Sequence, residues 1–304
     1  MERYNSVSSY LKEKFGQKIL KVSIDAGFTC PNRENGRRGC IFCGEDGAGE
    51  FAASRSLSIT EQIESQIEFL KHKSKTDKYI AYFQSFTNTY GNVVDLRKKY
   101  YEALDHPNIV GISIATRPDC IDKKIADLLY EISKIKETWV ELGFQTSNEG
   151  TAKLINRGYR NTELIKSINL LHNRGIKTIV HLIFGLPYET NIDWLNSIKF
   201  INELPIWGIK FHSLYIYRDS LLYDYYLKHK FNILERQEYV DGVCSAIEIL
   251  REDIVIHRIT GDPDKKKLYL PKWPMDKIRV IGNINKELKE KKIIQGKKPY
   301  LQEV

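Results

Sequence analysis

The stretch Ile19-Leu-Lys-Val-Ser-Ile-Asp-Ala-Gly-Phe-Thr-Cys-Pro-Asn-Arg-Glu-Asn-Gly-Arg-Arg-Gly-Cys-Ile-Phe-Cys43 joins a short apolar run to a loop with three cysteines. The run Ile19–Ile24 is rich in aliphatic and β-branched residues, which favours a β-strand. The loop is rich in Gly, Asn and Arg, which suits a chain that must bend tightly around a bound group. This stretch therefore predicts a strand that ends in a functional loop.

Similar apolar runs recur at Tyr79–Phe83, Val110–Ala115, Trp139–Phe144, Thr178–Phe184 and Ile209–Tyr215. Helical patterns lie between most of them, and one begins with a capping box from Ser58 to Glu61. Strands that alternate with helices predict βαβ units and a parallel sheet. Six such units are too few for a closed eight-stranded barrel, so the predicted fold class is α/β, a partial (β/α)6 barrel.

The pattern changes after Tyr217. Residues 220–251 look helical, Ile254–Ile259 looks like one more strand, and a basic tail follows. We therefore predict a core partial barrel over residues 1–218. Residues 219–304 would form a helical and basic C-terminal extension packed on the barrel.

The net charge of +8 is concentrated in the tail. Residues 265–304 hold twelve Lys or Arg against four Asp or Glu, which equals the whole excess. Two interpretations are open: a solvated C-terminus, or a surface for a polyanion such as RNA. The polar N-terminus and the lack of any apolar stretch near about 20 residues predict a cytoplasmic protein without a membrane segment.

Three of the five cysteines, Cys30, Cys40 and Cys43, fall within fourteen residues. In a reducing compartment such clustering indicates metal binding and not disulfides. A zinc site would want a fourth ligand, and the nearest histidine, His72, lies beyond a predicted helix. Three thiolates on a [4Fe–4S] cluster would leave one iron open to a small molecule.

The spacing Cys-x9-Cys-x2-Cys, with Phe42 before the last cysteine, resembles a radical S-adenosylmethionine (SAM) cluster motif with a widened first gap. The resemblance covers roughly residues 2–280. The motifs that carry it are Gly27-Phe-Thr-Cys-Pro-Asn-Arg33, Gln84-Ser-Phe-Thr-Asn-Thr-Tyr90, Thr116-Arg-Pro-Asp119, Glu141-Leu-Gly-Phe-Gln145, Gly185-Leu-Pro-Tyr-Glu-Thr190 and His257-Arg-Ile-Thr-Gly-Asp262. Together they resemble a bacterial family of small radical SAM proteins close to the Elongator catalytic subunit and oxygen-independent coproporphyrinogen oxidase.

Most of these motifs follow a predicted strand. Since chemistry in barrel-type α/β proteins sits at the carboxyl ends of strands, we expect them on one rim. The resemblance implies that Cys30, Cys40 and Cys43 bind the cluster. It further implies a set of cofactor-binding residues for SAM: Gln84, Ser85, Thr87, Arg117, Glu141, Gln145 and Arg157.

Several of these residues have a structural alternative. The sequence lacks the acidic residue of the superfamily's usual SAM-amino motif near Gln84. Glu141 could instead form a structural ion pair, and Arg157 could be a surface helix charge. Asp119 could be only a helix cap.

No catalytic residue is assigned, but three candidates stand out. His181 and His212 sit in mid-strand and could point inward toward substrate or pack in the core. Cys120 lies on the predicted rim, where a redox or hydrogen-donor role is open, whereas Cys244 suits core packing.

The resemblance implies an enzyme that reductively cleaves SAM to a 5′-deoxyadenosyl radical, with an electron donor such as flavodoxin or ferredoxin. It implies a role in tRNA modification, for example conversion of carboxymethylaminomethyl to aminomethyl on the wobble uridine, with the basic region binding tRNA. Two alternatives stay open: a radical SAM enzyme acting on a porphyrin or other cofactor precursor, and a non-catalytic metal- or cluster-bearing RNA-binding protein.

Overall fold

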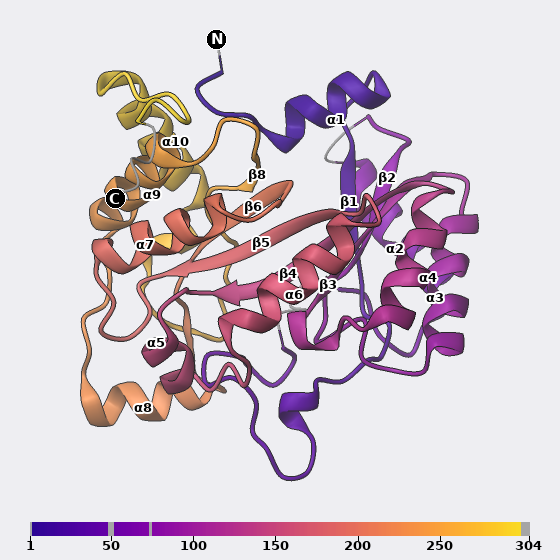
Figure 1. Ribbon diagram of the computed structural model, residues 1–304, viewed down its shortest axis with the longest axis horizontal. Coiled ribbons are helices and arrows are strands. Elements are labelled where there is room, and N and C mark those ends of the chain that lie inside the picture. The colour runs from indigo at the N-terminus through magenta and orange to yellow at the C-terminus, as the bar shows by residue number, and fades with distance from the viewer. Residues whose placement is uncertain (1, 48–51, 73–74, 299–304) are drawn as a thin grey trace.

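The computed structural model describes residues 2–47, 52–72 and 75–298. Seven parallel strands form one curled sheet in the order β1-β2-β3-β4-β5-β6-β8 (Figure 1). The strands are β1 (Leu20–Ile24), β2 (Tyr79–Phe83), β3 (Ile109–Thr116), β4 (Glu137–Gln145), β5 (Lys177–Phe184), β6 (Gly208–Ser213) and β8 (Val255–Arg258). The partial α/β barrel predicted from the alternation is therefore confirmed.

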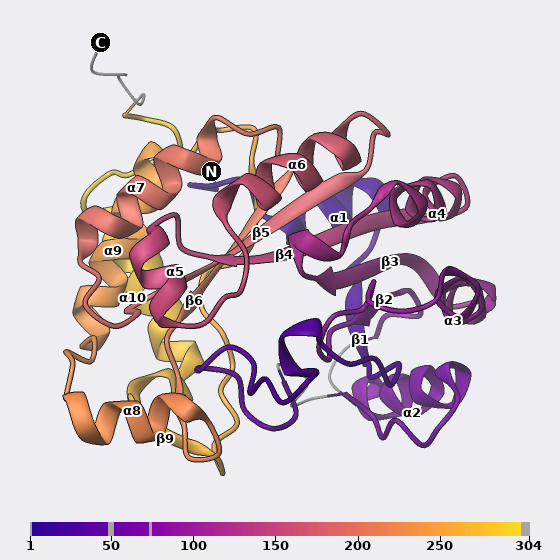
Figure 2. The same cartoon turned by 60° about the horizontal axis from the view of Figure 1, so that its bottom comes forward.

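Helices pack against the convex face of this sheet (Figure 2). They are α2 (Ile59–Lys71), α3 (Val93–Asp105), α4 (Lys123–Ser133), α6 (Asn161–His172), α7 (Asn191–Asn202), α9 (Arg236–Ile249) and α10 (Lys277–Glu290). Two shorter helices, α5 (Glu149–Leu154) and α8 (Leu221–His229), lie near the carboxyl edge of the sheet (Figure 1). The predicted capping box is present, since Ser58 and Glu61 bond each other's backbone at the start of α2.

The period of two along each strand separates the core from the interior of the barrel. In β4, Val140, Leu142 and Phe144 belong to the main hydrophobic core under the helices. Glu141 and Gln145, which alternate with them, line the concave side. Polar residues of the central strands thus meet inside the curled sheet.

Two details differ from the sequence prediction. The run Ile209–Tyr215 was predicted too long: β6 ends at Ser213, where the Leu214 amide donates to the Phe184 carbonyl and the chain turns. Tyr217 belongs instead to a short strand, β7 (Ile216–Tyr217), which pairs antiparallel with β9 (Leu268–Leu270).

The segment 219–304 also contributes to the main sheet. Its strand β8 pairs in parallel with β6 and makes the seventh strand. Residues 299–304 of the basic tail lie outside the described residues. Nowhere in the described ranges is there a helix with the length and apolar composition needed to cross a membrane.

Helix α1 (Val7–Phe15) closes the amino end of the barrel. Its Leu11 packs in a cluster with Trp139 of β4 and Ile179 of β5. Tyr10 meets Trp207 edge to face, with ring centroids 5.0 Å apart. Access to the interior is therefore from the carboxyl ends of the strands.

Candidate active site

One cavity of about 270 Å³ lies at the carboxyl ends of the strands, and all three cysteines of the loop line it. Each of six strands sends at least one residue to its wall. These residues include Gln84 after β2, Arg117 after β3, Gln145 of β4, His181 of β5, His212 of β6 and Arg258 of β8. The structure thus brings the cysteine loop and most of the polar motifs to a single enclosed space.

The cysteine loop is held by side chains from its own long first gap and from the segment after β4. Asn32 donates through Nδ2 to the Asn156 carbonyl at 2.7 Å, and Asn156 donates back to the Gly39 carbonyl at 2.6 Å. Arg33 donates to the carbonyls of Cys43, Gly44 and Glu45. The gap between Cys30 and Cys40 therefore shapes the loop, and Arg33 is used for that purpose.

Cys40 and Cys43 differ in their surroundings, since the hydrogen bond to Cys40 and burial raise the pKa of Cys43 well above its usual range. The pKa of Cys40 is lowered to about 7, first because it accepts a hydrogen bond from Cys43 and then through Arg117, Asn32 and Arg33, against the effect of burial. The Asn32 amide lies 3.5 Å from the Cys40 sulfur. A thiolate at this position is therefore stabilised, as a metal or cluster ligand must be.

Three cysteine thiolates that line one cavity are the type of donor set that holds an iron–sulfur cluster. Among the residues that the structure describes, no three His, Cys, Asp or Glu side chains are grouped as the ligands of one ion would be. Thiolates of an iron–sulfur cluster bind different irons, so they surround a volume and need not meet at a point. Three cysteines around one cavity match that requirement.

Residues after β2 present unsatisfied polar atoms. Gln84 and Thr87 line the cavity, and Gln84 Nε2 is buried without a hydrogen-bond partner. Ser85 Oγ is also buried and unpartnered, but Ser85 is not part of the cavity wall. A buried amide without a partner costs free energy unless a ligand satisfies it. Gln84 therefore offers a free amide donor to a polar ligand in the cavity, and Thr87 lines the same wall.

Glu141 is the centre of a buried network and not a free ligand group. Its side chain is 0% exposed and accepts from Lys21 at 2.8 Å, Ser113 at 2.6 Å, His181 at 2.7 Å, and Lys210. Although burial opposes ionisation, Lys21 and Lys210 hold the pKa of Glu141 well below its usual range. This geometry supports the structural ion pair that the sequence left open.

The two arginines of the predicted SAM set differ in role. Arg157, with a side chain 1% exposed, donates to the carbonyls of Phe144, Thr146 and Tyr159 and to Asn161 and Glu149. All its N–H groups are thus directed at the protein, which gives no support to a contact with the SAM carboxylate. Arg117 lines the cavity close enough to lower the pKa of Cys40.

Asp119 is not the cap of the following helix. Its carboxylate pairs with Arg117, with an Nη2–Oδ2 distance of 2.8 Å, and Asp122 caps α4 instead. The pair fixes the guanidinium of Arg117 at the rim. The Arg117 Nη1 also donates to the Arg157 carbonyl at 2.9 Å.

Both histidine candidates face the interior. Their rings are tilted against each other with centroids 5.3 Å apart, and both line the cavity. Burial lowers the pKa of His181 to about 4 and that of His212 well below its usual range, so both are neutral at physiological pH. Sequence reasoning missed Arg258, which joins them in the wall. The quoted motif His257-Arg-Ile-Thr-Gly-Asp262 held the signal, an arginine at the end of a strand.

The remaining thiols lie outside the cavity wall. Burial raises the pKa of Cys120 to about 12, so it is a neutral thiol, and it is not among the lining residues. Cys244 is part of the main core, with its sulfur 3.8 Å from the Ile284 carbonyl. The structure thus places neither thiol against the reaction space.

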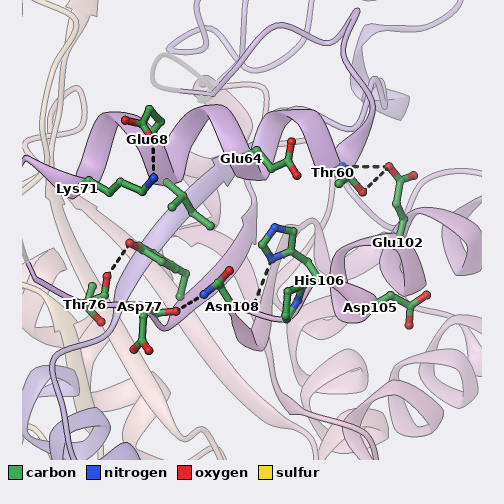
Figure 3. A pocket seen from close by; sticks show the side chains of 13 residues that line it. Thr60, Glu64, Glu68, Lys71, Thr76, Asp77, Glu102, Asp105, His106 and Asn108 are labelled. Atoms are coloured by element: carbon green, nitrogen blue, oxygen red, sulfur yellow. Dashed lines mark hydrogen bonds and ion pairs between the residues drawn. The ribbon is translucent and has the colours of Figure 1, made fainter.

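A second, wider groove of about 760 Å³ lies between α2 and α3 (Figure 3). It is lined by Glu64, Glu68, Asp105 and His106 and by residues just before β2 and β3. It is therefore at the amino ends of the strands, away from the cysteines. Chemistry in α/β sheets lies at the other edge, so this groove is not the candidate active site.

A curled parallel sheet with a three-cysteine loop at its carboxyl edge defines a radical SAM type of α/β enzyme. Residues 29–201 match the Radical SAM superfamily, and residues 206–290 match the Radical_SAM C-terminal domain. The chain is 40% identical over 298 residues to protein YtqA of Bacillus subtilis (strain 168), across 97% of this chain and 92% of that protein. The chain therefore belongs to the radical SAM superfamily and is an enzyme of that class, which implies a [4Fe–4S] cluster and SAM.

More distant relatives match a part of the chain. The chain is 28% identical over 169 residues to the tRNA uridine(34) acetyltransferase of Methanocaldococcus infernus, across 54% of this chain and 31% of that protein. The structure resembles that of the archaeal Methanocaldococcus infernus Elp3 with an N-terminal deletion, with a TM-score of 0.67 and 20% identity. That match spans 79% of this chain and 61% of the archaeal chain, and it shows the shared fold.

Proposed function

We propose that this radical SAM enzyme modifies tRNA at the side chain of the wobble uridine. The observation that carries the proposal is the position of the basic segment Lys265–Lys267. Lys267 pairs with Asp46 at 2.5 Å and with Asp219 at 2.9 Å, and Asp219 lies against the cysteine loop at Gly44 and Glu45. The exposed Lys265 and Lys266 therefore stand beside the loop, where a polyanion could reach the cavity.

The basic tail is divided between the two ends of the barrel. Gln295, past the end of α10, donates to the Ile254 carbonyl just before β8, at the amino edge of the sheet. Lysines from Lys289 onward are therefore on the side away from the cavity. The sequence predicted a polyanion-binding surface over the whole region 265–304. We limit the proposed surface to the first residues of that region, Lys265–Lys267.

The printed name of the archaeal relative supports the choice of RNA. That protein is a tRNA uridine(34) acetyltransferase, and its matched part covers 54% of the present chain. Its similarity to this chain makes a uridine at that tRNA position the substrate we propose here. The basic segment by itself suits any polyanion, including a porphyrin precursor with several carboxylates, and it is the similarity to a tRNA enzyme that selects RNA.

The residues of the cavity would bind and shield the reactants. When bound, the cluster supplies the electron that splits SAM, whose 5′-deoxyadenosyl group then takes a hydrogen atom from the substrate. Gln84, Thr87 and Gln145 would hold the polar parts of SAM. The charge of Arg117 stabilises the thiolate form of Cys40. The surrounding wall excludes water from the reacting groups.

A carboxymethylaminomethyl group offers a glycine-type carbon for hydrogen abstraction. Loss of one hydrogen atom and then of one electron to an oxidised ferredoxin or flavodoxin would leave an imine between nitrogen and that carbon. Water would add to the imine and release the aminomethyl uridine and glyoxylate. The reaction class is therefore oxidative removal of the carboxymethyl part.

The experiment is a SAM cleavage assay on anaerobically reconstituted protein with reductant, with and without tRNA that carries carboxymethylaminomethyl uridine. We expect 5′-deoxyadenosine well above the control without tRNA, together with aminomethyl uridine in the digested tRNA. Equal 5′-deoxyadenosine in both samples would exclude tRNA as the substrate.

A further inference from the structure

Three basic side chains lie around one buried carboxylate inside the barrel. Lys21 and Lys210 both pair with Glu141, and burial lowers the pKa of Lys210 well below its usual range. Arg258 is close by, since its charge lowers the pKa of His181 after burial and Lys210. Glu141 is already engaged by the two lysines, so the group that would balance the charge of Arg258 is an anion from outside.

The side chain of Arg258 has no hydrogen-bond or ion-pair partner within the described part of the chain, and it lines the cavity. The nearest carboxylate in the same motif, Asp262, is neutralised by Lys277. A guanidinium presents a rigid fork of donors that matches a carboxylate in two bonds. Its free donors therefore face the reaction space.

Two further polar atoms beside it are unsatisfied. His212 Nε2 and Ser213 Oγ, both at the end of β6, are buried without a partner. β6 neighbours β8, the strand that Arg258 ends. A Cβ on Gly261 would lie 3.2 Å from the His212 Nδ1, so the chain after β8 runs close to this imidazole. A neutral imidazole and a hydroxyl thus share the cavity wall with the guanidinium of Arg258.

We infer that Arg258, His212 and Ser213 form a subsite that binds the carboxylate of the substrate's reacting side chain. This inference rests on the proposed function and specifies how the carboxymethyl group is recognised. The subsite would fix the glycine-type carbon by its charged end and leave its hydrogen atoms toward the cysteine side of the cavity.

The two other anions in the reaction fit this subsite less well. The guanidinium groups whose charges act on Cys40 are Arg117 and Arg33, not Arg258, so an anion held beside the cysteines would meet those two side chains. A backbone phosphate of RNA is flanked by nucleotides on both sides, so it would have to bring both of them to the inside of the curled sheet to reach Arg258. A side chain that ends in a carboxylate can enter.

The test compares two tRNAs that differ only in charge, one with carboxymethylaminomethyl uridine and one with its methyl ester. For the wild-type holoenzyme we expect kcat/KM for the acid to exceed that for the ester by roughly 10- to 100-fold, the range for a hydrogen-bonded charge. R258Q should bring this ratio close to one, and R258K should restore part of it. The affinity for SAM should stay unchanged in all of them.

The control is R160Q, which removes an exposed arginine on the same rim without touching the cavity, and it should keep the wild-type ratio. A wild-type enzyme that accepts acid and ester equally overturns the inference while tRNA modification stands. A loss of SAM affinity in R258Q also overturns the inference, because it would show that Arg258 binds the carboxylate of SAM. If R258Q lowers kcat/KM equally for the acid and the ester, Arg258 binds a phosphate of the tRNA, and the inference is overturned too.

If neither tRNA supports SAM cleavage, the proposed function is wrong. A binding experiment then tests separately whether Arg258 belongs to a carboxylate-binding subsite. N-methylglycine mimics the end of the side chain, and dimethylamine is the matched probe without a carboxylate. We expect N-methylglycine, and not dimethylamine, to raise the melting temperature of the wild-type holoenzyme, as a ligand of the folded state does. The same rise in R258Q, or none in the wild type, overturns the inference.

Discussion

Arg157 shows how the surroundings of one side chain decide its role. It lies close to the cysteine loop, yet its guanidinium bonds the carbonyls of Phe144 and Thr146 at 3.1 and 2.8 Å. A buried arginine with all its donors engaged acts as a brace for the end of β4. A positive charge near a cofactor site is therefore not by itself a cofactor ligand.

Replacing Arg157 tests that interpretation. R157M should lower the free energy of unfolding by about 3 kcal/mol, because several buried carbonyls lose their donor. Denaturant unfolding of R157M and of the exposed control R160M measures the difference, and the control should change by less than about 0.5 kcal/mol. Folded R157M should bind SAM as tightly as the wild type. A selective loss of SAM affinity with unchanged stability would return Arg157 to the cofactor site.

The three loop cysteines differ from the other two in what surrounds their sulfurs. We expect C30S, C40S and C43S each to lose the iron–sulfur chromophore after anaerobic reconstitution, because a cluster with fewer thiolates is not retained. C244A, in the hydrophobic core, and C120S should keep it. Iron and sulfide content per protein and the visible absorption spectrum measure the result. Full iron content in C40S would contradict the cluster assignment.

At the scale of elements, one carboxylate joins α1 to the amino ends of β4 and β5. Glu137 pairs with Lys14 of α1 and Lys177 of β5 and accepts from Trp139 Nε1 at 2.8 Å. Against the effect of burial, these hydrogen bonds lower its pKa from 4.5 to about 2. The helix that closes the barrel is thus held by an interaction that depends on pH.

The sign of that dependence follows from the lowered pKa. Between pH 4.5 and pH 2 the unfolded chain binds a proton at Glu137 that the folded chain does not, so stability falls as pH falls through this window. E137Q should be less stable than the wild type at neutral pH, with a difference that shrinks toward pH 2. Thermal unfolding from pH 2 to pH 7 measures it. The exposed pair variant E163Q should leave the profile unchanged, and a constant difference for E137Q would contradict the linkage.

At the scale of the whole molecule, the chain places its positive charge at both ends of the barrel, and only one end has the cavity. Lys265 and Lys266 lie at the cavity end, whereas Lys289 and Lys292 lie at the far end. The double variants K265Q/K266Q and K289Q/K292Q remove the same charge from the same tail. They therefore separate the effect of position from that of net charge.

We expect K265Q/K266Q to weaken tRNA binding and to reduce the slope of log K against log salt by about 1.5, as loss of two phosphate contacts would. K289Q/K292Q should leave both nearly unchanged. Binding titrations at several salt concentrations measure the two slopes. Equal losses of affinity in both variants would show that net charge alone attracts the RNA. No loss of affinity in either variant would show that these lysines do not bind tRNA.

Much of the architecture was predictable from the chain because it depends on local patterns. Alternating apolar runs and helical faces indicate a parallel sheet, since each pattern reflects which side of an element is buried. The boundary at Ser213 was not predictable, because Leu214 and Tyr215 are as apolar as a strand. The turn there depends on pairing with Phe184 and on the later strand β9.

By itself the sequence determined the class of chemistry, because the spacing of Cys30, Cys40 and Cys43 in one loop is a property of neighbours along the chain. Only the tertiary structure decided what the charged residues do. Glu141 and Arg157 are bonded within the protein while Arg258 faces the cavity. Those differences come from side chains that are distant in sequence, because curling the sheet brings the ends of separate strands to one place.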